Sequence, residues 1–352
     1  RKAADKWADT TPEGQQARNR IVAQHAVDGN IDKARAELEG VLKAAPDNPD
    51  ALLTRATFAF LDRRYDAAIA DLRAVLRRRE SPEAVLLLAR SYAGTGDLVT
   101  AKDTYRQLLA IDPQNAEAGA ELAALLTREG DPDAGAELLR EVLARRPDDP
   151  KASVALVETL LAKRDLAAAE AEAQKMIERG AGGVDVEERL GRVLQAKGSN
   201  AEALARFRSI LERDPKQAAA REGLVSILLD EGRAAEAIDF LEQYPADDLD
   251  ASLLRGRAFA RSGDIVAARE EHERAIRAVP GDARAYLALA ALAPPESGEQ
   301  LAVLQRAWRA VPGDATVALF LGSLHERAGR RAEAVAVYDV ALAKDPANVI
   351  MA

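Results

Sequence analysis

The sequence repeats itself with a period of 34 residues. Prolines follow this period, because 34 residues separate Pro113 from Pro147 and twice that number separate Pro147 from Pro215. Glycines recur between the prolines in the same rhythm, at Gly29, Gly96, Gly130, Gly198, Gly232, Gly263 and Gly329. A fixed period of this length is typical of chains that stack small helical units, because one unit cannot bury its apolar face alone.

The composition favours helices as the repeating element. Hydrophobic residues make up 48% of the chain, whereas aromatic residues make up only 4%. The apolar residues are mostly alanine and leucine, which lose little side-chain entropy in a helix. Strand-forming residues are sparse. The sequence therefore predicts an all-α fold.

Each period contains an apolar helix, a break at glycine and a second helix that ends near a proline. The third period shows the recurring residues Leu88, Ala89, Tyr92, Gly96, Ala101, Tyr105 and Pro113. Their counterparts are Leu190, Gly191, Gly198, Ala203, Phe207 and Pro215 in the sixth period, and Leu321, Gly322, Gly329, Ala334, Tyr338, Ala341 and Pro346 in the last. In these residues the sequence resembles the tetratricopeptide repeat (TPR) family over residues 15–348. The resemblance implies a right-handed superhelical solenoid of about ten helix-turn-helix repeats.

Each recurring residue has a physical role. The glycine turns the chain after the first helix, where a positive φ is needed. An alanine of the second helix faces the first helix, and a larger residue there would cost about 1–3 kcal/mol by overpacking. The proline ends the second helix because it cannot continue the hydrogen-bond ladder. The alanines are Ala34, Ala68, Ala101, Ala169, Ala203, Ala237, Ala268 and Ala334.

The period divides the chain into ten expected hairpins. They span residues 15–48, 49–81, 82–115, 116–149, 150–183, 184–217, 218–248, 249–282, 283–314 and 315–348. Residues 1–14, with Trp7, are expected to be the tail of a preceding helical element, and residues 349–352 the start of a further helix, so that the chain is a piece of a longer protein. The short seventh hairpin and Pro294-Pro295 in the ninth predict irregular stacking near residues 243–250 and 293–299.

Charge and residue usage argue against several other classes of protein. The net charge is -9 with both signs interspersed, whereas a nucleic-acid binder usually carries a basic segment. No run of 18 apolar residues could span a membrane, and the absence of cysteine excludes disulfides and thiolate metal sites. His25, His272 and His325 occupy packing positions of the repeat. We therefore expect no catalytic site, no metal and no cofactor.

The resemblance also predicts a binding surface. In TPR proteins the first helix of each hairpin lines the inside of the superhelix, mainly through the second, fifth, ninth, twelfth and thirteenth residues. The ninth, twelfth and thirteenth residues place Arg90, Arg128, Glu158, Arg192, Arg257, Arg261 and Arg327 there, with Asp230 and Glu326. Apolar residues expected beside them are Leu53, Phe60, Leu61, Leu86, Leu161, Leu229 and Leu253.

Two interpretations of these arginines remain open. They could form a stripe that binds acidic peptides or an anionic polymer, since the guanidinium group pairs bidentately with carboxylates. Alternatively, they could pair with acidic residues of neighbouring repeats and keep the surface soluble. Replacing Arg192, Arg257 and Arg261 would distinguish the two.

The predicted function is that of a non-catalytic scaffold that binds partner proteins or peptides in this groove. Cysteine-free arrays rich in alanine and arginine are similar to the bacterial envelope or periplasmic modules of exopolysaccharide export and assembly. Two alternatives remain: a substrate-presenting arm of a larger enzyme such as a glycosyltransferase, and a cytoplasmic adaptor. An enzyme arm should carry many asparagines at the inward positions, and Asn19 is the only one found there.

Overall fold

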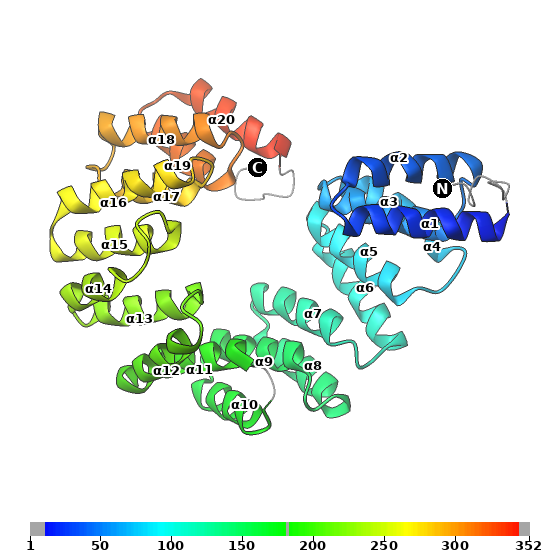
Figure 1. Cartoon of the computed structure of the whole chain (residues 1–352), viewed down its shortest axis with the longest axis horizontal. Helices are drawn as coiled ribbons and strands as arrows, with labels where there is room; N and C mark the ends of the chain where they lie inside the picture. The colour runs from blue at the N-terminus through cyan, green and yellow to red at the C-terminus, as the bar shows by residue number, and fades with distance from the viewer. Residues whose placement is uncertain (1–10, 181–182, 345–352) are drawn as a thin grey trace. The chain divides into compact units, whose positions relative to one another are not determined.

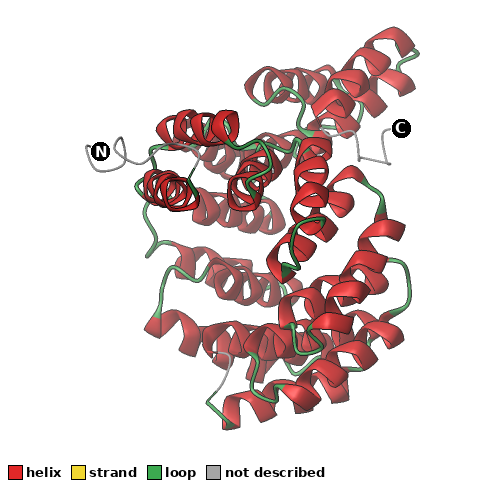
Figure 2. Ribbon diagram, turned by 90° about the vertical axis from the view of Figure 1, so that its right-hand side faces the viewer, coloured by secondary structure: helices red, strands yellow, loops and turns green. Residues whose placement is uncertain are grey.

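The computed structural model describes residues 11–180 and 183–344, and this part of the chain consists of helices and short connections (Figures 1 and 2). It contains twenty α-helices and no strand, which confirms the predicted all-α repeat fold. The helices are α1 (Pro12–Val27), α2 (Ile31–Ala44), α3 (Pro49–Leu61), α4 (Tyr65–Leu76), α5 (Pro82–Thr95), α6 (Leu98–Ile111), α7 (Ala116–Arg128), α8 (Pro132–Arg145), α9 (Pro150–Lys163), α10 (Leu166–Glu178), α11 (Gly183–Lys197), α12 (Asn200–Arg213), α13 (Ala218–Asp230), α14 (Ala234–Leu241), α15 (Leu249–Ser262), α16 (Ile265–Ala278), α17 (Ala283–Ala291), α18 (Gly298–Ala310), α19 (Ala315–Arg327) and α20 (Arg331–Lys344).

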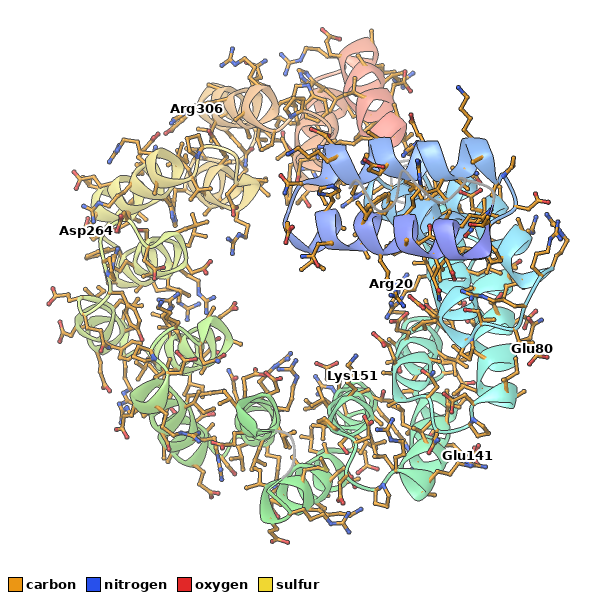
Figure 3. The ribbon with its side chains drawn as sticks, turned by 45° about the vertical axis from the view of Figure 1, so that its right-hand side comes forward. Arg20, Glu80, Glu141, Lys151, Asp264 and Arg306 are labelled. Atoms are coloured by element: carbon orange, nitrogen blue, oxygen red, sulfur yellow. The ribbon has the colours of Figure 1, made fainter. Side chains whose placement is uncertain are left out.

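Odd-numbered helices are the first helices of the hairpins and even-numbered helices the second. Within both units, first helices pack on the second helix of their own hairpin, as α3 does on α4, and α4 in turn packs on α5 of the next hairpin. The chain forms two compact units, Arg1–Thr159 and Leu160–Ala352, with their boundary inside α9. Charged side chains such as Glu80 and Glu141 point from the first unit into solvent (Figure 3).

The observed ends differ slightly from the predicted ones. The first helix begins at Pro12, after the N-cap residue Thr11, so it starts three residues before the expected start of the first hairpin. Thr11 accepts a hydrogen bond from the backbone N–H of Gly14, which satisfies one of the free donors at the start of the helix. The expectations for residues 1–10, including Trp7, and for residues 349–352 lie outside the described residues.

The small-residue seam between paired helices is present as the repeat pattern predicts. All eight alanines at the crossing are at most 1% exposed, from Ala34 to Ala334. The fourth hairpin has Gly135 at this place, and a Cβ atom there would lie 3.0 Å from the carbonyl oxygen of Ala123. The two helices of this hairpin therefore approach more closely than alanine would allow without a shift of the backbone.

The hairpin turns require a left-handed residue, and two hairpins supply it without glycine. The seven turn glycines have φ between 72° and 91°. In the second and fifth hairpins the same place is taken by Arg63 and Arg164, with φ of 59° and 64°. A side chain in this region clashes with its own backbone, which costs about 1–2 kcal/mol.

Substituting Arg164→Gly should therefore stabilise the protein. Glycine removes the strain energy of the left-handed conformation, and this gain exceeds the loss that comes from the larger conformational entropy of the unfolded chain. The net gain in the free energy of unfolding is about 0.5–1 kcal/mol. Urea denaturation followed by circular dichroism measures this gain. The control Arg140→Gly lies inside α8 and should lose about 1 kcal/mol; a loss for both variants would contradict the strain at Arg164.

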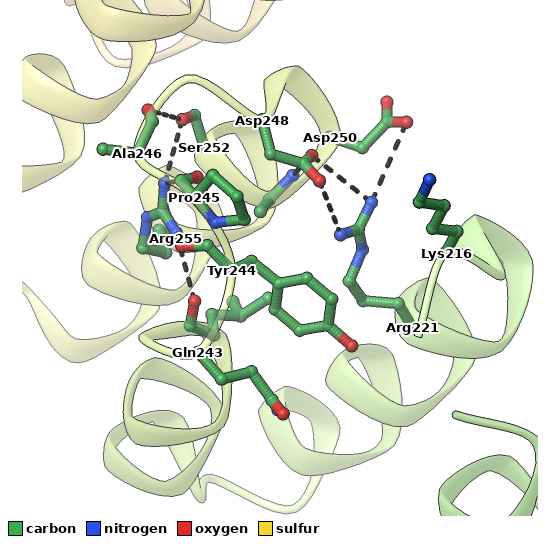
Figure 4. A network of polar contacts seen from close by, with 12 residues as sticks. Lys216, Arg221, Gln243, Tyr244, Pro245, Ala246, Asp248, Asp250, Ser252 and Arg255 are labelled. Atoms are coloured by element: carbon green, nitrogen blue, oxygen red, sulfur yellow. Dashed lines mark hydrogen bonds and ion pairs between the residues drawn. The ribbon is translucent and has the colours of Figure 1, made fainter. Parts of the chain in front are cut away.

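The two shortest helices of the described chain are α14, with eight residues, and α17, with nine, and they adjoin the segments where the sequence predicts irregular stacking. After α14, the buried Arg255 holds the loop in place (Figure 4). Its guanidinium donates to the carbonyl oxygens of Leu241 at 3.1 Å and Tyr244 at 3.4 Å, and to Glu271 at 3.0 Å. Arg255 stands where the third hairpin has Leu88, so a buried cation replaces an apolar residue to close a shortened repeat.

Replacing this cation by the consensus apolar residue should destabilise the second unit. Arg255→Leu leaves the buried Glu271 carboxylate without its partner across the hairpin and the loop carbonyls without donors, which costs about 3 kcal/mol. The double variant with Glu271→Leu should recover part of this loss, because no charge is then left buried. Chemical denaturation of the three proteins measures both values, and an unchanged midpoint for the single variant would refute the role of Arg255.

Candidate partner-binding groove

A groove of about 680 Å³ runs across three successive first helices of the second unit. These are α13, α15 and α17, with one residue contributed by α16. The groove is lined by Ala218, Ala219, Glu222, Asp250, Leu253, Leu254, Arg257, Ala260, His272, Arg284, Ala288, Ala291 and Leu292. Grooves of this size lined by apolar residues with a few polar groups are the usual form of a binding site.

The repeat itself creates the groove. Small side chains project from all three helices, such as Ala219 of α13, Ala260 of α15 and Ala288 of α17, so the surface between the helices remains hollow. The larger apolar side chains of the lining are Leu253, Leu254 and Leu292. Regular helix packing thus presents an apolar floor with charged residues around it.

The charged residues of the groove differ in how tightly they are paired. Arg284 lies 2.8 Å from Asp250 of α15 and 2.8 Å from Asp282. Its hydrogen bond lowers the pKa of Asp282 below the ordinary value. By contrast, Arg257 approaches Glu222 of α13 only to 4.0 Å. The guanidinium of Arg257 therefore carries a charge that is only loosely compensated.

His272 reaches the groove from the second helix of its hairpin. It is 3% exposed, and its ring lies against Gly256 of α15, where a Cβ atom would be only 2.3 Å from the ring. Its Nδ1 atom is buried and has no hydrogen-bond partner among the described residues. Burial lowers the pKa of His272, because water no longer stabilises the charged imidazolium.

This burial makes stability depend on pH near neutrality. The pKa values of His272 and His325 are both lowered by desolvation, so below about pH 6.5 the unfolded chain binds more protons than the folded one. Stability is complete above that pH and decreases as the pH falls. His272→Phe, which matches Phe207 of the sixth hairpin, should remove part of the decrease. Urea midpoints at about pH 7.5 and pH 5.5 test this, and a wild-type midpoint equal at both would contradict it.

The structure brings only some of the predicted binding residues into this groove. Arg257 and Leu253 line it. Arg261, one turn further along α15, is exposed and donates to the carbonyl oxygen of Leu229 at 3.1 Å. The side chains of Leu53 and Leu229 are 9% and 2% exposed and belong to the core. Phe60, Leu86 and Leu161 are half-buried, and Leu61 is exposed.

Most of the other predicted arginines pair with acidic residues. Arg90 is bonded to Glu117 at 2.7 Å and to Glu121, Arg327 lies 3.1 Å from Glu296, and Arg192 lies 3.9 Å from Glu188 on its own helix. Arg128, Glu158, Asp230 and Glu326 are exposed, and Arg128 has no ion pair within the described part of the chain. Pairing between repeats, the second of the two interpretations, thus describes Arg90 and Arg327.

Glu222, Asp250, Arg284 and His272 line the groove but are not among the binding residues predicted from the sequence. The first three occupy the second or fifth residue of their hairpins, which the repeat pattern also directs inward. His272 was assigned to packing, which its burial bears out, but it also lines the groove. No group of three potential metal ligands occurs among residues 11–180 and 183–344. No helix in the same ranges is long and apolar enough to cross a membrane.

Comparisons with known proteins agree with this architecture. Two tetratricopeptide repeat models match, one at residues 126–185 and 194–258, the other at 25–79, 62–116, 239–283 and 301–349. No curated protein matches. The crystal structure of a tetratricopeptide repeat protein from Parabacteroides merdae is similar in fold, with 16% identity, a TM-score of 0.52 and coverage of 69% of this chain and 98% of that chain.

Other solved structures are more distant. Human IFIT1, in a dimer with PPP-AAAA, shows 19% identity, a TM-score of 0.48 and coverage of 94% of this chain and 84% of that chain. PilF of Pseudomonas aeruginosa shows 22% identity and a TM-score of 0.42, over 58% of this chain and 94% of that chain. Tetratricopeptide repeats support a general role as a protein–protein interaction scaffold.

Proposed function

Because the chain belongs to the tetratricopeptide repeat family, we propose that it is a non-catalytic scaffold that holds a segment of a partner protein in the groove formed by α13, α15 and α17. The observation that carries this proposal is the alignment of three first helices around a groove of about 680 Å³ with an apolar floor. A groove built on helices needs little rearrangement to accept a partner, so less binding energy is spent on ordering the site.

The ion pairs between the helices support the same proposal. Arg284 links α17 to Asp250 of α15 at 2.8 Å. Arg306 of α18 lies 2.7 Å from Glu273 of α16, so the second helices are paired in the same way. Exposed pairs of this kind contribute little stability, about 0–1 kcal/mol each. The Arg284–Asp250 pair nevertheless joins two of the three helices that form the groove.

We also propose a bacterial envelope setting, in polysaccharide export or assembly, with an anionic polymer as a further partner. The supporting observations are the cysteine-free composition and the alanine- and arginine-rich repeats. The alternatives are a substrate-presenting arm of a glycosyltransferase and a cytoplasmic adaptor. The groove lining contains no asparagine, which does not favour the enzyme arm. Fractionation of cells that carry the full-length gene distinguishes an envelope protein from a cytoplasmic one.

A bulky side chain on the groove wall should abolish partner binding. Ala291 is exposed at the end of α17 and lines the groove, so Ala291→Trp fills the groove without disturbing the core. Peptides selected from a displayed library on the wild-type protein should bind this variant at least about tenfold more weakly, a loss of about 1.4 kcal/mol. Isothermal titration calorimetry measures the affinities.

The matched control is Ala201→Trp. Ala201 is also an exposed alanine, but it lies on α12 and does not line the groove. Selected peptides should bind this variant as they bind the wild type, and the melting temperatures of both variants should stay close to that of the wild type. Equal binding by all three proteins would place the partner site elsewhere and refute the proposal.

A further inference from the structure

The first unit contains a carboxylate held between an arginine and a tyrosine. The carboxylate belongs to Glu121 of α7. Arg90 of α5 donates to it through Nε at 2.9 Å, and Tyr105 of α6 donates through its hydroxyl at 2.5 Å. Burial and this hydrogen bond raise the pKa of Tyr105 well above its ordinary value. Three side chains from two successive hairpins thus form one satisfied polar cluster.

The second unit has the same arrangement of positions with the carboxylate missing. Arg90 and Arg257 are each the ninth residue of their hairpins, 82–115 and 249–282. Tyr105 and His272 are each the twenty-fourth. The sixth residue of the following hairpin is Glu121 in the first unit, but Ala288 in the second.

Another hairpin confirms that these positions meet in space. Phe207 is the twenty-fourth residue of hairpin 184–217, and Gly223 is the sixth residue of the next. A Cβ atom on Gly223 would lie 2.5 Å from the Phe207 ring. The ring at the twenty-fourth position therefore reaches the sixth residue of the next first helix in both units. Ala288 and His272 accordingly line the same groove, together with Arg257.

The groups that would hold the missing carboxylate are not fully used. Nδ1 of His272 is buried against Gly256 and lacks a partner, and Nε2 makes no hydrogen bond within the described chain, whereas the hydroxyl of Tyr105 has one. The closest carboxylate to Arg257 is that of Glu222, at 4.0 Å, whereas Arg90 is bonded tightly to two carboxylates. Where the first unit has Glu117, the second residue of its hairpin, the second unit has Arg284, so one further acidic group is replaced by a basic one.

We infer that the groove is a receptor for an acidic side chain, and that a glutamate or aspartate of the partner segment lies over Ala288 between Arg257 and His272. This inference rests on the proposed function of the groove. The partner's carboxylate takes the place that Glu121 fills in the first unit. Arg257 donates to it, and the neutral imidazole of His272 donates through its one N–H group.

The remaining charges around the groove allow this exchange. Arg284 is already compensated by Asp250 and Asp282, and Glu271 beside His272 is bonded to Arg255 and Arg274. Glu222 faces Arg257 from the opposite wall at a distance too long for a hydrogen bond. Arg257 can therefore turn to an incoming carboxylate without breaking a close ion pair. The imidazole is shorter than a phenol, and with alanine at residue 288 the groove extends down to the ring.

The test uses two peptides that differ in one group. One is acetyl-Ala-Leu-Ala-Glu-Ala-Leu-Ala-amide and the other has glutamine in place of glutamate, so neither carries terminal charges. The three histidines of the chain allow the imidazole signals of His272 to be assigned by NMR with His272→Phe. The glutamate peptide should shift these signals and bind at least about tenfold more tightly than the glutamine peptide. Arg257→Ala should remove the difference.

Arg192→Ala is the matched control, because Arg192 is also the ninth residue of its hairpin but does not line the groove. It should leave the preference for glutamate intact. A third peptide has glutamine in place of glutamate and a free C-terminal carboxylate, which is the other possible source of the carboxylate. If it binds more tightly than the blocked glutamate peptide, the assignment to a side chain is overturned. If the blocked glutamate and glutamine peptides bind with equal affinity and both shift the His272 signals, the groove does not recognise a carboxylate. The proposal that the groove binds a partner segment would still hold. Loss of library-selected peptides with Ala291→Trp is independent of this outcome.

A second pair of variants tests the receptor with a carboxylate supplied by the chain itself. Ala288→Glu should restore within the chain the cluster seen at Glu121, raise the titration midpoint of His272 and prevent the glutamate peptide from binding. Ala288→Gln has the same shape without the charge, and it should leave the titration midpoint near that of the wild type. Equal midpoints in the two variants would show that no carboxylate at residue 288 reaches His272.

Discussion

The close approach of paired helices over alanine is the constraint on which this structure depends. Each alanine at the crossing is essentially inaccessible to water, so the two helices of a hairpin touch along their backbones. Larger side chains pack within their own hairpin, as Phe207 does against Gly191, and also against the next one, as Phe207 does against Gly223. One hairpin alone cannot bury its apolar surface. A consequence is that the first helices of neighbouring hairpins present their other faces at a fixed spacing on the inward side, where the groove lies. The groove exists because this spacing is set by the seam and not by the groove residues themselves.

The same constraint explains why the fold could be predicted so fully from the sequence. The turn glycine recurs seven times and the seam alanine eight times, so departures such as Arg63 at a turn do not obscure the period. Departures at core positions were harder to interpret. Arg255 looks like a polar residue in an apolar place, and only the structure shows that its donors close the loop after α14. The bonds of a buried arginine depend on loop geometry that no periodic pattern contains.

The candidate site could be predicted only in part. The repeat pattern places Arg257 and Leu253 on the inward face, and both line the groove. The same pattern also predicts an inward position for Leu229, but its side chain is 2% exposed and packs in the core. A position in the repeat predicts the direction of a side chain but not how deeply it is buried. The degree of burial depends on the size of the residues on the two neighbouring helices. Whether an arginine is paired also depends on the rotamers of both partners, as the contrast between Arg90 and Arg257 shows.

Equivalent positions of different repeats, set side by side, show which polar groups lack a partner that other repeats supply. In hairpins that fulfil only a structural role, polar groups at equivalent positions should satisfy each other, because an unpaired buried polar group costs about 1–3 kcal/mol. The cluster of Arg90, Tyr105 and Glu121 meets this condition. Arg257 and His272 retain the donors and line one groove with Ala288, which cannot accept a hydrogen bond through its side chain. A repeat that keeps the donors and lacks the acceptor therefore carries an energetic cost that a bound partner can remove. Such a position in a repeat array is suited to binding.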